Sequence, residues 1–274
     1  MRLSEAERLL SDAGVPSARH DARAIFSEIG NIPMEKLLFG DAECEAAEVA
    51  VAVKRRAARE PLQYIIGEVG FYNESYIVNK DCLIPRQDTE TLVEYAVSNI
   101  PEGESFIDIC TGSGCVAISV LANTKGTHAV MVDVSEGALC VAEKNAIKNG
   151  VSDRCERIAA DALAEPVIFG GGKYFAVLSN PPYVREDVYE TLDREIRFAP
   201  RIAFVGGEDG SVFYRRLVPL YKEHIKKDGF MAFEIGYDQA ELLLEIADEN
   251  GMAASIIRDL SGKDRVAVLR FKNQ

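Results

Sequence analysis

The first part of the chain has apolar residues at the spacing of amphipathic α-helices. Steps of three and four residues separate the apolar positions Leu3, Ala6, Leu9 and Leu10, and likewise Ala22, Ile25, Phe26 and Ile29. Glycine or proline interrupts this pattern at 14–17, 30–33 and 39–41, where we expect turns. Residues 1–69 are therefore predicted to form a small helical bundle, with substrate recognition or simple packing as its role.

The pattern changes after this bundle. Residues 70–83 place aromatic side chains around a polar turn, which predicts a linking β-hairpin and a junction between domains. The next segment, 84–90, reads Ile-Pro-Arg-Gln-Asp-Thr-Glu and leads into apolar positions at helical spacing. Asp88 and Thr89 are residue types that cap a helix, so a helix start is the ordinary interpretation of this segment.

Residues 84–274 form the third predicted part, in which short apolar runs alternate with helical patterns. The predicted strands are 104–110, 129–132, 155–158 and 174–178, and the predicted helices between them are 116–121 and 135–149. This alternation is typical of an α/β domain built on a mostly parallel sheet.

Polar residues occur at the carboxyl ends of these predicted strands. The first strand contains Asp108 and runs into a turn with Gly112 and Gly114, Asp133 ends the second, and Asp161 follows the third. Glycines let a ligand approach the backbone closely, and a carboxylate after the second strand is placed to accept hydrogen bonds from ribose hydroxyls. The turn departs from the Gly-x-Gly-x-x-Gly fingerprint, which disfavours a pyrophosphate ligand. Each aspartate alone is an ordinary strand end or cap, but together they predict a ligand site.

The fourth strand ends in Asn180-Pro181-Pro182-Tyr183. Asn-Pro and Pro-Pro are common turn formers, so this stretch by itself is an ordinary strand-ending turn. The two prolines remove two backbone donors, and the loop therefore presents mainly acceptors, including the side-chain oxygen of Asn180. Acceptors followed by an aromatic ring suit a planar NH2 group, whose hydrogens would meet carbonyl oxygens while Tyr183 covers its flat face.

Composition and charge narrow the class of partner. The chain has 274 residues, is 47% hydrophobic and 27% charged, and carries a net charge of −13, as expected of a folded protein but unfavourable for binding long nucleic acids. One basic patch, 54–56 with Arg59, is interpreted as a solvated helix face or a partner contact. The apolar runs are too short to span a bilayer and the N-terminus lacks a signal-peptide core, so a cytoplasmic location is expected.

The cysteines and histidines do not suggest a metal centre. The six cysteines and three histidines are scattered, without a Cys-x-x-Cys pair. A disulfide framework and a metal site are therefore not expected, and most of the thiols are predicted to be small buried hydrophobes.

These features together resemble the S-adenosylmethionine-dependent methyltransferases of the HemK/PrmC type, which modify the glutamine N5 of the Gly-Gly-Gln motif in peptide chain release factors. The resemblance covers nearly the whole chain. It rests on the segments 59–67, 83–90, 108–114, 180–183, 234–239 and 259–266. It departs from the usual pattern at Gln87, where a second proline is usual, and at Ala199, where a glutamate is usual.

The resemblance implies a fold, a cofactor and a set of site residues. The implied fold is a Rossmann-like class I methyltransferase domain with a mixed, mostly parallel seven-stranded sheet. The implied cofactor is S-adenosylmethionine, with S-adenosylhomocysteine as product, bound by Asp108, Thr111, Gly112, Gly114, Asp133, Asp161 and Asn180. The implied catalytic residues are Asn180, Pro181 and Tyr183, and these with Pro182 bind the substrate amide. No metal is implied.

Three alternatives remain open from the sequence. Adenine methyltransferases of nucleic acid share the Asn-Pro-Pro-Tyr motif, although the charge of −13 argues against them. The second alternative is methylation of a glutamine in another translation protein, such as a ribosomal protein, by the same chemistry. A cofactor-binding regulator without catalysis is the third. We expect class I release factors as substrates, a monomer, and neither membrane nor direct nucleic-acid binding.

Overall fold

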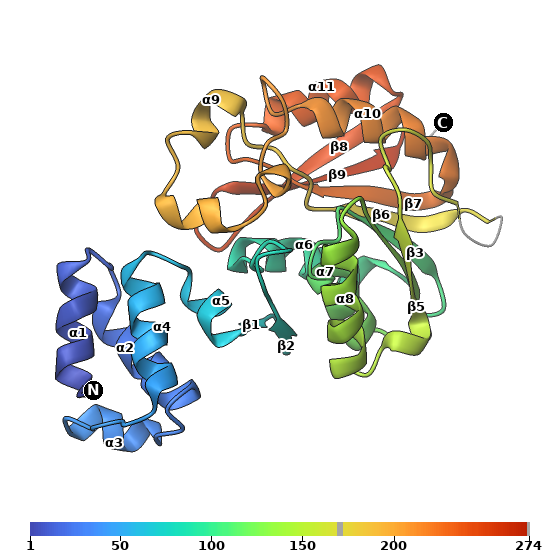
Figure 1. Ribbon diagram of the computed structural model, residues 1–274. Helices are drawn as coiled ribbons and strands as arrows, with labels where there is room; N and C mark the ends of the chain where they lie inside the picture. The colour runs from blue at the N-terminus through green and yellow to red at the C-terminus, as the bar shows by residue number, and fades with distance from the viewer. Residues whose placement is uncertain (169–171, 273–274) are drawn as a thin grey trace. The chain divides into compact units, whose positions relative to one another are not determined.

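The computed structural model describes residues 1–168 and 172–272, which divide into two compact units (Figure 1). Unit 1 comprises Met1–Glu68 together with the distant segment Asp193–Phe198. Unit 2 comprises Val69–Leu192 and Ala199–Gln274. The three domains predicted from the sequence, 1–69, 70–83 and 84–274, remain a prediction.

Unit 1 is the helical bundle that the apolar spacing predicts. Its helices are α1 (Leu3–Asp12), α2 (Ala18–Glu28), α3 (Met34–Phe39), α4 (Ala47–Ala57) and α5 (Leu62–Ile66). Their apolar faces meet in one core, in which Leu10, Ile25, Phe26, Leu37 and Val53 are fully buried. Burial of such a side chain contributes about 1.5–3 kcal/mol, so the helices are held by packing rather than by their own propensity.

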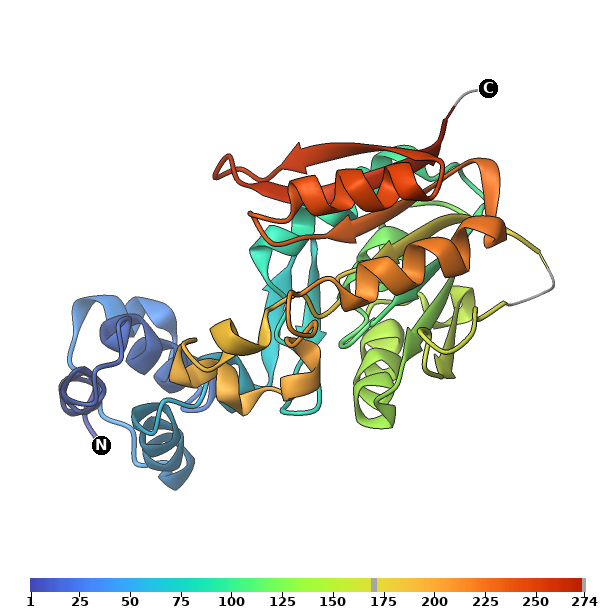
Figure 2. The same ribbon diagram turned by 90° about the horizontal axis from the view of Figure 1, so that it is seen from above.

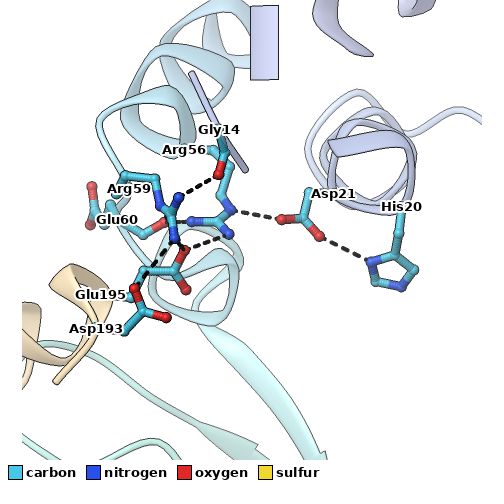
Figure 3. A network of polar contacts seen from close by, with 8 residues as sticks. All are labelled: Gly14, His20, Asp21, Arg56, Arg59, Glu60, Asp193 and Glu195. Carbon is cyan, nitrogen blue, oxygen red and sulfur yellow. Dashed lines mark hydrogen bonds and ion pairs between the residues drawn. The ribbon is translucent and has the colours of Figure 1, made fainter. Parts of the chain in front are cut away.

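Two residues of the basic patch, Arg56 and Arg59, do not lie on a solvated face, whereas Lys54 is exposed. Arg56 is 4% exposed, donates from Nε to Asp21 Oδ2 at 2.7 Å, and donates from Nη2 to Glu195 Oε1 at 2.9 Å (Figure 3). Arg59 donates to the same Glu195 oxygen at 3.0 Å. Glu195 lies in the 3-10 turn η3 (Arg194–Phe198), so these two arginines hold the distant segment within unit 1.

Unit 2 contains a hairpin and one large sheet. The hairpin pairs β1 (Glu68–Phe71), whose first residue closes unit 1, with β2 (Glu74–Ile77). The large sheet consists of β3 (Ser105–Ile109), β4 (His128–Asp133), β5 (Cys155–Ala159), β6 (Tyr174–Ser179), β7 (Ile225–Glu234), β8 (Met252–Arg258) and β9 (Asp264–Phe271). Within the described chain it has seven strands in the order β5-β4-β3-β6-β7-β9-β8, and β9 runs antiparallel to both neighbours. This confirms the predicted Rossmann-like methyltransferase architecture.

Helices cover both faces of this sheet. On one face lie α6 (Glu90–Asn99), α7 (Cys115–Ala122) and α8 (Glu136–Lys148), which share a core with Phe106, Met131 and Leu178. On the other lie α10 (Val212–Tyr221) and α11 (Ala240–Glu249), in front of the strands in Figure 2. Because both faces are covered, the central strands are mostly apolar, and β6 is buried at every position.

The parallel strands β3, β4 and β6 end at one edge of the sheet. Their registers pair Ile109 with Val132 and with Ser179, so the residues that follow these three strands lie next to one another. Ligands of open α/β sheets bind at this edge. No helix among the described residues is both long and apolar enough to cross a membrane.

Candidate functional site

A cavity of about 270 Å³ lies at the carboxyl edge of the sheet. Of the residues predicted for the site, Gly112, Asp133, Asp161, Asn180 and Pro182 line it. The strand-end argument therefore brings together residues from four successive turns of the chain. Asp108, Thr111, Gly114, Pro181 and Tyr183 belong to the same turns but are not among the lining residues.

Asp108 supports the glycine turn from behind. It is 1% exposed, and its Oδ2 accepts a hydrogen bond from Thr111 Oγ1 at 2.6 Å and one from the Ala117 amide at 3.3 Å. Burial raises the pKa of Asp108 to about 7, although both donors lower it. Asp108 and Thr111 thus fasten the turn to the first turn of α7.

Gly112 and Gly114 allow the turn its shape. Both have positive φ, 56° and 80°, in the left-handed region where a side chain is disfavoured. A Cβ on Gly114 would lie 2.8 Å from Ile118 Cδ1 and 3.1 Å from Ala142 Cβ, so this glycine also permits close packing of α7 on α8. The Gly112 amide donates to Asp133 Oδ2 at 2.9 Å, which joins the turn to the end of β4.

Asp133 and Asp161 are polar residues of the cavity wall, together with Asp81, Ser135 and Asn180. Asp133 accepts from the backbone amides of Gly112 and Ser135, and burial raises its pKa against these two donors. Asp161 accepts from the Leu163 amide at 2.9 Å. Most of the remaining wall is apolar, with Val132, Val134, Ala160, Ala162, Leu163 and Phe213. The cavity therefore suits a ligand with a hydroxylated part and a flat apolar part.

Asn180 directly follows β6, and the nitrogen of its side-chain amide is hydrogen-bonded. Its Nδ2 donates to Thr89 Oγ1 at 3.1 Å, whereas no described residue donates to its Oδ1. The hydroxyl of Tyr183, three residues on, donates to Glu234 Oε1 at 3.2 Å. Burial raises the pKa of the Tyr183 phenol, so it stays protonated. The loop accordingly presents an amide oxygen, as the sequence predicts.

Glu234 and Thr89 contact residues of this site, although the sequence analysis assigned neither of them to it and considered Thr89 only as a helix cap. Glu234 ends β7 and is 2% exposed, and burial raises its pKa to about 7 against lowering contributions from Thr89, Arg265 and Tyr183. Arg265 in turn pairs with Asp88 and Asp259, each at 3.2 Å. A carboxylate directly after the apolar run 230–233, at the start of the segment 234–239, is the signal that could have identified Glu234.

Two further walls of the cavity were also not foreseen. One is formed by residues 81–83, after the hairpin, and the other by Pro200, Ile202 and Ala203 near the turn η4 (Arg201–Ala203). Residues 81–83 fall in the stretch 70–83 that the sequence predicts as a hairpin, but in the structure they follow β2. Neither segment ends a predicted strand of the large sheet, so the strand-end argument did not assign it to the site. The described residues contain no group of His, Cys, Asp and Glu that could hold a metal ion, and their six cysteines are free.

Comparisons with known proteins match both parts of the chain. The model of the PrmC N-terminal domain matches residues 2–67, and that of the methyltransferase small domain matches residues 87–227. A release factor glutamine methyltransferase of Caulobacter vibrioides is 34% identical over 98% of this chain and 94% of its own length. One of Fusobacterium nucleatum is 34% identical over 95% of this chain and 75% of its own length.

Solved structures share the fold at lower identity. The ribosomal protein L11 methylase of Lactobacillus delbrueckii subsp. bulgaricus aligns with a TM-score of 0.51 and 18% identity, over 72% of this chain and 84% of its own. That likeness concerns the fold alone.

Proposed function

The chain belongs to the release factor glutamine methyltransferase family, and on this premise we propose that it methylates the N5 side-chain nitrogen of the Gly-Gly-Gln glutamine in class I release factors. It is an S-adenosylmethionine-dependent methyltransferase that acts on protein glutamine. The observation that carries the proposal is the Asn180 amide, whose nitrogen is engaged by Thr89 and whose oxygen remains available beside the cavity.

The cavity residues fit S-adenosylmethionine. Asp133, which lines the cavity, would accept from the ribose hydroxyls, and the apolar neighbours of Asp161 would lie against the adenine. Gly112 would let the backbone approach the methionine part, while Asp108, Thr111 and Gly114 keep the turn in shape. The bound cofactor supplies an electrophilic methyl group. Binding by these residues fixes the direction from which the substrate nitrogen must approach.

The nitrogen of the substrate glutamine is a weak nucleophile, because its lone pair is delocalised into the carbonyl. Asn180 compensates by orienting this nitrogen. Its Oδ1 and the Pro181 carbonyl accept the two N–H groups of the substrate glutamine and aim the nitrogen at the cavity. The same oxygens stabilise the positive charge that grows on nitrogen during transfer. Orientation of this kind lowers a barrier by up to about 7–11 kcal/mol. A strong base is not required before transfer.

Tyr183 and Pro182 complete the amide site. Pro182 lines the cavity, and its ring adds a rigid apolar wall without a competing donor. The Tyr183 hydroxyl donates to Glu234, and its ring would cover the flat face of the substrate amide. The net charge of −13 favours a protein substrate over a long nucleic acid. A cytoplasmic location and a monomeric state are part of the proposal.

The intact mass of a class I release factor, before and after incubation with this enzyme and S-adenosylmethionine, tests the function. We expect a gain of one methyl group, and none in a factor whose Gly-Gly-Gln glutamine is changed to alanine. The enzyme variant Asn180→Ala is expected to bind the cofactor normally and to lose transfer. Absence of transfer by the unchanged enzyme, with cofactor binding confirmed, would contradict the proposal and direct the test to ribosomal proteins and then to adenine.

A further inference from the structure

Thr89 does not perform the capping role that its position suggests. It precedes α6, but its side chain makes no capping hydrogen bond to the helix among the described residues. Thr89 is 1% exposed, and its hydroxyl oxygen instead accepts from Asn180 Nδ2 at 3.1 Å. Asn180 lies 91 positions further along the chain. The segment 84–90 therefore leads into a helix and also contacts the residue that follows β6.

The Thr89 hydroxyl has one proton, and that proton needs an acceptor. Its oxygen already accepts from Asn180, so the hydroxyl must donate elsewhere in a buried setting. Glu234 faces it: the Thr89 side chain lowers the pKa of that carboxyl as a hydrogen-bonding neighbour. Glu234 Oε1 accepts from Tyr183, while the buried Oε2 has no partner within hydrogen-bond distance among the described residues. The Thr89 hydroxyl, which acts on this carboxyl, is therefore available as a donor to the oxygen that has no partner.

This chain of donors decides which end of the Asn180 amide faces the cavity. A side-chain amide can turn over, exchanging its NH2 group and its oxygen at little steric cost. An ionised Glu234 only accepts, so Thr89 donates to it and can only accept from Asn180. We infer that Glu234 and Thr89 are positioning residues that hold the Asn180 amide with Oδ1 toward the cavity. The inference rests on the proposed role of Asn180 as an acceptor for the substrate amide.

The opposite arrangement becomes available when Glu234 can donate. A neutral carboxyl, or the amide of a glutamine, can offer a hydrogen to Thr89, which then donates to Asn180 Oδ1. The NH2 group of Asn180 would turn to the cavity and repel the N–H groups of the substrate. The ionised form of Glu234 is therefore the active one.

The charge around Glu234 sets the pH at which this happens. Burial raises its pKa to about 7, and the neighbouring Arg265 opposes that rise. The titratable, charged or hydroxyl groups that act on Glu234, or on which Glu234 acts, are Asp88, Thr89, Cys115, Tyr183, Tyr214 and Arg265. Turnover is expected to rise with pH through about 7, because the proton leaves Glu234 over that range.

A matched set of threonine variants tests the relay. Thr89→Val keeps the shape but loses the hydroxyl, and kcat should fall on the order of 100-fold while the cofactor Kd changes less than about twofold. Thr89→Ser restores the hydroxyl and should recover most of kcat. Thr91→Val removes a hydroxyl two residues further on, in α6, and serves as the control. Equal activity of Thr89→Val and the unchanged enzyme, or equal loss in Thr89→Ser, would overturn the inference.

Glu234→Gln separates positioning from a structural role. Its kcat should be low, and the rise of kcat with pH through about 7 should be absent because the side chain no longer ionises. A purely structural role of Glu234 predicts a lower melting temperature with the pH-dependent rise retained. That retained rise, or an unchanged kcat, would contradict the inference.

A readout without substrate keeps this inference distinct from the proposed function. The side-chain NH2 signals of Asn180, assigned by their loss in Asn180→Ala after 15N-asparagine labelling, report the hydrogen bond to Thr89. They should titrate near pH 7 in the unchanged protein and stay fixed in Glu234→Gln. If release factors are not methylated but these signals titrate, only the proposed function fails. Signals that do not respond to Thr89→Val would refute the relay.

Discussion

At the scale of single residues, the site divides into side chains that line the cavity and side chains that hold those in place. Asp133 lines the cavity, whereas Asp108 lies behind the turn with its oxygen taken by Thr111 and Ala117. Both carboxyls have raised pKa values because of burial, so the pKa shift alone does not tell a ligand contact from a structural support. The position of each carboxyl relative to the cavity distinguishes a ligand contact from a structural support.

Replacement of Asp133 by asparagine tests the ribose contact. A charge-assisted hydrogen bond contributes about 1.5–3 kcal/mol net, so the Kd for S-adenosylmethionine should rise by roughly 10- to 100-fold. Isothermal titration calorimetry measures this directly. Asp153→Asn, an exposed aspartate of the turn η2 (Ser152–Arg154), is the control and should leave the Kd unchanged. A Kd of the wild-type size in Asp133→Asn would remove this residue from the cofactor site.

Comparison with Gly103 separates two roles of Gly114: it adopts a positive φ, and it permits close packing of α7 on α8. Both have positive φ, 80° and 78°, but a Cβ on Gly103 would meet no atom within 4 Å, whereas one on Gly114 would lie 2.8 Å from Ile118 Cδ1. Gly103→Ala should cost about 1 kcal/mol of unfolding free energy from backbone strain alone, and Gly114→Ala should cost about 1–3 kcal/mol more. Urea unfolding of both variants gives the difference. Equal losses would show that α7 and α8 yield to the added methyl group.

At the scale of elements, the segment after the Asn180 loop links distant parts of the sequence. The chain leaves unit 2 at Leu192, contributes Asp193–Phe198 to unit 1, and returns at Ala199 to residues that line the cavity. Its anchor in unit 1 is the pair of arginines on and after α4 that contact Glu195. A buried ion pair adds little net stability, but loss of one partner leaves the other charge buried and unpaired.

Arg56→Met tests this anchor. It removes the buried partner of Asp21 and Glu195, so the unfolding free energy should fall by about 3–5 kcal/mol. Limited proteolysis should then cleave within 193–198 faster than in the unchanged protein. Lys54→Met changes an exposed charge of the same helix and should alter neither measurement. An unaltered cleavage rate in Arg56→Met would mean that other contacts hold the segment.

At the scale of the whole molecule, two buried carboxyls shape the dependence of stability on pH. Burial raises the pKa of Asp108 and of Glu234 to about 7, above the value that a carboxyl has in an unfolded chain. Between about pH 4 and pH 7 the folded state therefore binds more protons than the unfolded state. The contribution of these two groups to the unfolding free energy falls as the pH rises through that range.

The variant Asp108→Asn tests the contribution of Asp108 to the pH dependence of the unfolding free energy. Without the titrating group, its decline in unfolding free energy between pH 5 and pH 8 should be shallower than that of the unchanged protein, whatever its absolute stability. Thermal unfolding in a series of buffers measures both slopes. Parallel slopes would show that Asp108 titrates alike in the folded and unfolded chain.

Much of the fold and part of the site could be predicted from local sequence. The helices of unit 1, the strands ending near Ile109, Val132 and Leu178, and the acceptor loop at Asn180 all follow from periodicity or from residue types that act over a few positions. The parallel arrangement then places their carboxyl ends at one edge, so Gly112, Asp133, Asp161, Asn180 and Pro182 were correctly expected to lie together.

The tertiary structure alone decided which side chains meet across long separations. Thr89 contacts Asn180, Tyr183 contacts Glu234, and Arg56 contacts Glu195, at separations of 91, 51 and 139 positions. Local sequence constrains the backbone of each segment, but the partner of a buried polar group depends on which strands are neighbours and which loops return to them. The sequence by itself therefore determined the elements and the acceptor character of the loop, and the packing determined what holds that acceptor in place.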